Sequence, residues 1–112
     1  MRYLNENILN AAAAQTDVTG SAIDASYLVS ASVIATGTTG VSSAIVHLQA
    51  SNDPAIATAP VNWVDIATVT VTTNSTYMIA KQDLCYRWIR VTYAHGSSAS
   101  GTITINLECL GF

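Results

Sequence analysis

The sequence predicts an all-β protein: an antiparallel β-sandwich, jelly-roll-like, of about seven to eight strands with an N-terminal arm. Several short segments alternate between apolar and polar side chains, which is the period of a strand with one buried face. Clusters of glycine, proline, asparagine and serine separate these segments about every 8–15 residues. Half of the 112 residues are hydrophobic, so one domain of this length can bury a core.

Residues 1–16 are expected to form the N-terminal arm or an edge strand, ahead of a sandwich domain over residues 17–112. Ala11–Ala14 have high helix propensity. The three asparagines that precede them interrupt any apolar helical stripe, so the arm and the edge strand stay as the two alternatives.

Two alternating segments follow, over residues 25–35 and 43–51. In the first, the expected apolar face consists of Tyr27, Val29, Ala31, Val33 and Ala35. In the second, it consists of Ala44, Val46, Leu48 and Ala50. Each face lies opposite polar side chains, as in a strand that covers a core on one side.

The longest loop is expected over residues 52–62, which contain two prolines. A strand over residues 63–71 follows, and its alternation slips near Ala67, which predicts a β-bulge. A short strand is expected over residues 75–80, after a turn at Thr73 and Asn74.

The last third of the chain resembles a β-hairpin, with arms over residues 86–93 and 102–109. Aligning the apolar faces of the two arms pairs Val91 with Ile103 and Ile89 with Ile105.

The same register sets Cys85 against Cys109. The two cysteines are therefore expected to lie close together, either as a disulfide or as reduced core thiols. Reduced thiols are favoured, because the N-terminus has no apolar signal-peptide segment and synthesis in a host cytoplasm is expected.

Composition restricts the partners. Only 10% of residues are charged and the formal net charge is −3, so we expect no nucleic-acid partner. No apolar run approaches the roughly 20 residues of a membrane span, so no membrane partner is expected either. A surface with so few charges gives little repulsion between copies, which favours burial against other protein subunits.

No motif for catalysis, a cofactor or a metal is found, so we expect a protein that is not an enzyme and needs no cofactor. His47 and His95 fall on separate predicted elements, without convergent partners. Asn52 and Asp53 could contribute to a calcium site, but an Asx-type turn explains them more simply.

The candidate interface residues are Tyr86, Trp88, Arg90 and Trp63. Alternation places the first three on the face opposite Ile89, and tryptophan and arginine are enriched at binding hot spots. Trp88 also offers a stacking platform for a sugar. Alternatively, Trp88 packs into the core or beneath the long loop, while Arg90 pairs with an aspartate, Asp83 or Asp65.

Several segments together resemble a known family: Leu48–Asp53 (LQASND), Asn62–Ile66 (NWVDI), Tyr86–Val91 (YRWIRV), Ile103–Ile105 (ITI) and Gly111. The pattern is similar to that of small β-sandwich structural proteins of tailed-phage virions, including capsid decoration (cement) proteins. A weaker similarity, over residues 48–111, is to discoidin-like jelly rolls, which bind carbohydrate or lipid. This chain is too short for a complete domain of that type, and its first forty residues do not match it, so no ligand loops are carried over.

The first resemblance implies a bacteriophage virion protein, most simply a capsid decoration protein that binds the major capsid protein as a homo-oligomer. A trimer is the expected oligomer, because closed assemblies suit capsid symmetry. Two alternatives stay open: a carbohydrate-binding module for host-glycan adhesion, and a structural protein of the tail or head–tail connector.

Overall fold

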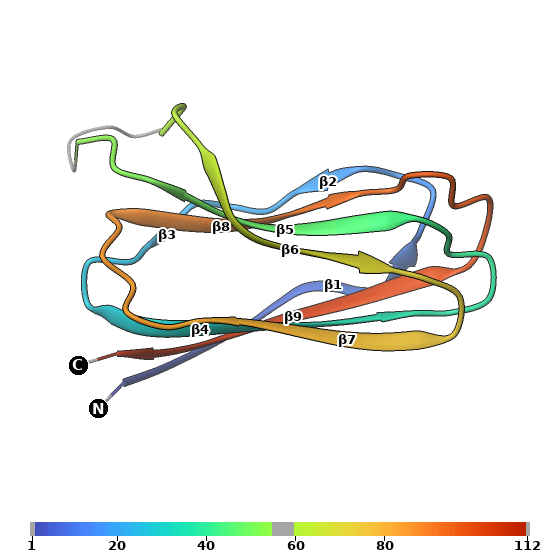
Figure 1. The fold of residues 1–112 in the computed structure, drawn as a ribbon, viewed down its shortest axis with the longest axis horizontal. Helices are drawn as coiled ribbons and strands as arrows, with labels where there is room; N and C mark the ends of the chain where they lie inside the picture. The colour runs from blue at the N-terminus through green and yellow to red at the C-terminus, as the bar shows by residue number, and fades with distance from the viewer. Residues whose placement is uncertain (1, 55–59, 112) are drawn as a thin grey trace.

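The computed structural model describes residues 2–54 and 60–111, which form an antiparallel β-sandwich. The predicted fold class is confirmed. Figure 1 shows the two sheets as an upper and a lower layer, with both chain ends at the same end of the lower layer. Within the described ranges there is no helix, and hence none that is long and apolar enough to cross a membrane.

The lower layer, which we call the β4 sheet, has the strand order β1-β9-β4-β7. Its strands are β1 (Arg2–Ala13), β9 (Thr102–Gly111), β4 (Leu28–Gly37) and β7 (Ser75–Lys81). The upper layer, the β5 sheet, has the order β2-β8-β5-β6, and β3 also pairs with β8. Its strands are β2 (Val18–Thr19), β3 (Ile23–Asp24), β8 (Trp88–Ala94), β5 (Ala44–Ser51) and β6 (Val64–Val71).

The core lies between the layers, where alternate side chains of both sheets interdigitate. The apolar face predicted for β5 is confirmed, since Ala44, Val46, Leu48 and Ala50 are all buried. The largest fully buried side chains are Leu48, Ile89, Ile103, Ile105, Leu107, Val33, Val41, Val46, Val71, Val91 and Cys109.

The predicted terminal hairpin is wrong, because β8 and β9 lie in different sheets. Val91 is paired with Leu48 of β5, and Ile103 with Gly37 of β4. The apolar faces of both arms contribute to the same buried core, one from each sheet. Alternation shows that each strand is half-buried and does not identify its hydrogen-bonded neighbour.

The expected proximity of the two cysteines depended on that hairpin register. Both are free thiols: Cys85 is exposed ahead of β8, and Cys109 is 1% exposed on the inner face of β9. Burial raises the pKa of the Cys109 thiol to about 11, with smaller contributions from Glu108 and Glu6. The Cys109 thiol is therefore protonated at neutral pH.

The N-terminal segment forms an edge strand of the sandwich. β1 pairs with β9 from Arg2 opposite Gly111 to Ala13 opposite Thr102, with two register shifts on the way. Beyond the strand, the backbone N–H of Ala14 donates to the carbonyl of Gly101 (3.1 Å). Pairing with β9 therefore overrides the helix propensity of the alanines.

Of two further predictions, the bulge in β6 is confirmed and the buried face at the start of β4 is wrong. The bulge near Ala67 is confirmed, because Leu48 pairs with Ala67 while Gln49 pairs with Asp65, which leaves Ile66 unpaired. The face predicted for the start of β4 is wrong. A register shift between Leu28 and Ser30 turns Leu28 into the core and leaves Tyr27 exposed.

Candidate functional site

A hydrogen-bonded network crosses the outer face of the β5 sheet and centres on Arg90. The Arg90 guanidinium lies 4.3 Å from the centre of the Trp63 ring, and its Nε donates to Oε1 of Gln49 (2.7 Å). Gln49 donates through Nε2 to Oδ1 of Asp65 (2.8 Å), and His47 Nδ1 lies 3.0 Å from the other Asp65 oxygen. Arg90 therefore reaches Asp65 through an amide, not through a direct ion pair.

The electrostatics of this network follow from these contacts. The pKa of Asp65 is lowered, first by the hydrogen bond from Gln49 and then by the contact with His47. Partial burial lowers the pKa of Arg90, because the desolvated guanidinium is less favourable when charged. The network therefore links Arg90, Gln49, Asp65 and His47 in a chain of side-chain contacts.

Trp88 belongs to a second cluster on the same sheet. The Arg87 guanidinium lies 4.5 Å from the Trp88 ring centre and is ion-paired with Asp24. The Trp88 indole N–H donates to the carbonyl of Asp53 (3.2 Å), and the Trp63 indole N–H donates to the carbonyl of Pro60 (2.8 Å). Both indoles are half-buried. Through these hydrogen bonds, Trp88 contacts the start of the long loop at Asp53, and Trp63 contacts the loop near its end at Pro60.

The structure thus brings Trp63 and Arg90 together and places Trp88 beside Arg87. Tyr86 does not share their outer face, because it packs against the hydrophobic core. The sequence interpretation missed two partners of these residues: Gln49, which bonds Arg90, and Arg87, which lies over the Trp88 ring. Sequence alone could not find those contacts, since Gln49 and Arg90 meet only when β5 pairs with β8.

The carboxylate of Asp53 accepts hydrogen bonds from three N–H donors. These donors are the backbone N–H of Val61 (2.6 Å), the backbone N–H of Asn62 (3.1 Å) and Asn62 Nδ2 (2.7 Å). These bonds lower the pKa of Asp53, the side chain of Asn62 most strongly. The expected Asx-type turn is wrong, because the Asp53 side chain bonds residues eight and nine positions further on and Asn52 Oδ1 accepts the N–H of Arg87. No group of three metal-ligating residues occurs in the described part of the chain. Residues 55–59 of the expected loop lie outside the described residues.

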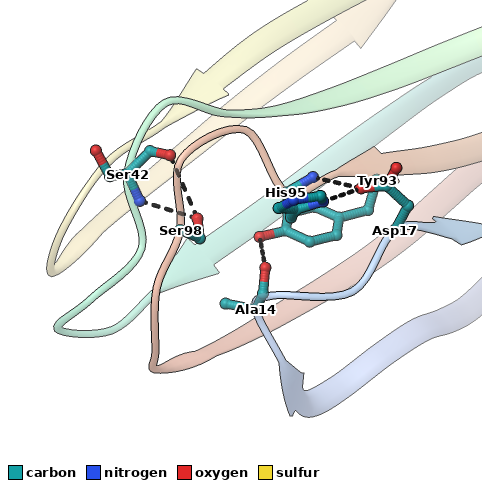
Figure 2. Close-up of polar contacts among 6 residues, drawn as sticks. All are labelled: Ala14, Asp17, Ser42, Tyr93, His95 and Ser98. Atoms are coloured by element: carbon teal, nitrogen blue, oxygen red, sulfur yellow. Dashed lines mark hydrogen bonds and ion pairs between the residues drawn. The ribbon is translucent and has the colours of Figure 1, made fainter.

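The predicted isolation of His95 is wrong. Figure 2 shows that Asp17 contacts both the ring and the backbone N–H of His95, the latter at 2.8 Å. These contacts lie where residues 95–101 cross from one sheet to the other. Gly96 (φ +58°) allows this crossing, because a Cβ there would lie 2.1 Å from the carbonyl oxygen of Ser43.

Two further contacts fasten the same crossing (Figure 2). The buried Tyr93 hydroxyl donates to the carbonyl of Ala14 (2.8 Å). The Ser98 hydroxyl accepts the N–H of Ser42 (3.0 Å) and contacts its carbonyl (3.3 Å). These bonds tie the crossing to the segment after β1 and to the turn before β5.

The outer face of the β4 sheet is chemically different, and we call it the neutral face. Register sets its side chains in rows across four strands; for example, Asn106 lies beside Ile34, and Ile34 beside Met78. Glu108 supplies the one charge among its central residues. These are Tyr3, Asn5, Asn7, Ser30, Ser32, Ile34, Thr36, Thr76, Met78, Ala80, Thr104, Asn106, Glu108 and Leu110. Met78 is 64% exposed.

No known protein family and no curated protein matches the chain. Solved structures do match. The PBSX exported protein XepA has a TM-score of 0.74 and 13% identity, over 97% of this chain and 37% of that chain. The SPBc2 prophage-derived protein YomS has a TM-score of 0.60 and 10% identity, over 96% and 92%.

A third similar structure is the icosahedral particle of infectious bursal disease virus (IBDV). Its TM-score is 0.55 and its identity 12%, over 98% of this chain and 31% of that chain. This chain therefore spans about a third of the XepA and viral chains that it matches. At these identities the likenesses establish the fold.

Proposed function

We propose that this protein is a non-catalytic structural subunit of a bacteriophage particle, a decoration protein that binds capsid subunits through its neutral face. The neutral face is the observation that carries the proposal. Its residues are mainly serine, threonine, asparagine and aliphatic side chains, with Glu108 as the one charge among those named. Burying such a surface avoids the large desolvation cost of charged groups.

The size of the neutral face fits a subunit contact. Four strands about 4.8 Å apart and about ten residues long cover roughly 600 Å². A stable protein contact buries roughly 800 Å² on each partner, so this sheet with its flanking loops provides most of one. The prophage-derived neighbour and the viral-particle neighbour support a particle role by analogy of fold. In our proposal the subunits form a closed homo-oligomer, a trimer, on the particle surface.

The test is co-sedimentation of the purified protein with undecorated capsids of the phage that encodes it. We expect Ile34→Glu and Met78→Glu to reduce capsid binding at least tenfold, because each places a charge in the contact. Ile45→Glu is the matched control: Ile45 pairs with Thr70 and Ala94 on the outer face of the other sheet, and its variant should bind normally.

Two results would overturn the proposal. One is that the unmodified protein neither pellets with capsids nor appears in the mass spectrum of purified particles. The other is equal binding by the neutral-face variants and the control. Gold labelling of particles then separates decoration from tail or connector duty, since a label confined to the tail or neck contradicts decoration.

A further inference from the structure

The sandwich is open at one corner, where the first residues of β6 turn away from the β4 sheet that faces them (Figure 1). Val64 pairs with Ala50 and points toward the interior, yet Val64 is 66% exposed while Ala50 is 3% exposed. The unpaired Ile66 of the bulge bends the strand there. Figure 1 shows this part of β6 rising away from β7.

The opening forms a cleft of about 480 Å³ between β6, the end of β5 and the segment that precedes β8. Val64, Ile66 and Ala50 supply aliphatic lining, and Tyr86 supplies an aromatic side chain. The volume lies within the range of small-ligand sites, roughly 300–1,000 Å³. Val64 is thus far more exposed than the other inward-facing residues of β5 and β6.

Two amide side chains line the cleft, and other bonds already fix their orientation. Asn52 Oδ1 accepts the backbone N–H of Arg87 (3.0 Å), which leaves the Asn52 Nδ2 donors without a partner among the described residues. Asn62 Nδ2 donates to Asp53 (2.7 Å), which leaves Asn62 Oδ1 as an acceptor. The cleft therefore offers both a neutral donor and a neutral acceptor.

The charge of the lining restricts the ligand. Asp53 is the one charged residue of the cleft lining, so the lining repels anions, and the three N–H donors on Asp53 weaken its attraction for a cation. The matching ligand is neutral, with an apolar face for the aliphatic and aromatic lining and hydroxyl groups for the amides.

We propose that this cleft binds a neutral hexopyranose unit of a glycan. One face of such a ring presents C–H groups, and its edge presents hydroxyls that donate and accept. The cleft does not use the Trp63 and Trp88 rings, because an arginine guanidinium already lies over each of them. The inference does not depend on the capsid contact, which lies on the outer face of the β4 sheet.

The experiment is a ¹H–¹⁵N NMR titration of the whole chain with the methyl glycosides of glucose, galactose, mannose and glucuronic acid. We expect saturable shifts at the backbone amides of Asn52, Asn62 and Val64 with at least one neutral sugar. Glucuronate should bind at least fivefold more weakly than that sugar. Val64→Asp should weaken binding at least tenfold, and because Val64 is exposed the variant should still fold.

Met78→Asp is the matched control, since Met78 has nearly the same exposure but lies on the neutral face. It should bind the sugar normally and lose capsid binding, whereas Val64→Asp should do the reverse. The inference is overturned if no neutral sugar gives saturable shifts, if glucuronate binds as well as the best neutral sugar, or if Val64→Asp leaves binding unchanged. Because capsid binding is measured separately, failure of either proposal is distinguishable from failure of the other.

Discussion

Tyr93→Phe tests how much the buried Tyr93–Ala14 hydrogen bond contributes to the stability of the protein. Tyr93 is 2% exposed, and its hydroxyl donates to the carbonyl of Ala14 (2.8 Å) at the end of the edge strand. The substitution removes the donor and leaves a carbonyl without its partner in a dry site. Such a loss costs about 1–3 kcal/mol, so we expect unfolding to become easier by about 2 kcal/mol.

For a domain of this size, each kcal/mol corresponds to roughly 3–6 °C in Tm, so the expected fall is about 6–12 °C. Thermal unfolding followed by circular dichroism measures it. Tyr77→Phe is the matched control, because the same atom is lost from a solvent-exposed contact with Thr72 (3.1 Å). That variant should change stability by less than about 0.5 kcal/mol. Equal effects of the two variants would refute the claim that burial of the Tyr93 bond sets its contribution.

Two further predictions concern thiol reactivity and acid stability. In the native protein a thiol reagent should label Cys85 quickly and Cys109 only after unfolding, since Cys109 is buried and its pKa is raised to about 11; a Cys85→Ser variant that still labels quickly would contradict this. The folded pKa of Asp53 lies below 3.8, so its contribution to stability is present above that pH and is lost as pH falls through the folded pKa. Asp53→Asn should therefore lower stability at pH 7 and flatten the acid limb of a denaturation curve measured from pH 7 to pH 2. An unchanged acid limb would show that the carboxylate does not contribute through its N–H donors.

Alternation in the sequence was sufficient to predict strands and their buried faces wherever one strand covers the core without irregularity. The face of β5 was predicted residue by residue, and the slip at Ala67 located the bulge. Prediction failed at Leu28, where a register shift exchanges the inner and outer faces. The shift reverses the side chains before it, whereas Ala31, Val33 and Ala35 after it are buried as predicted, and a local pattern gives no sign of such a shift.

The candidate site was less predictable, because its residues meet through strand neighbours that are distant in sequence. Arg90 and Trp63 were selected from residue type, and the structure places them in contact. Gln49, which links Arg90 to Asp65, carried no local signal. The neutral face depends on the order β1-β9-β4-β7, which no alternating pattern encodes.

By itself, the sequence determined an all-β sandwich, a surface with few charges and no catalytic motif, because periodicity and composition are local properties of the chain. Tertiary structure alone decided which strands are neighbours. It separated β8 from β9, buried Cys109 while leaving Cys85 exposed, and assembled a neutral face and an open corner from distant segments. The physical reason is that a half-buried strand specifies which of its faces is apolar. Its partner is chosen by how all the strands together close one core.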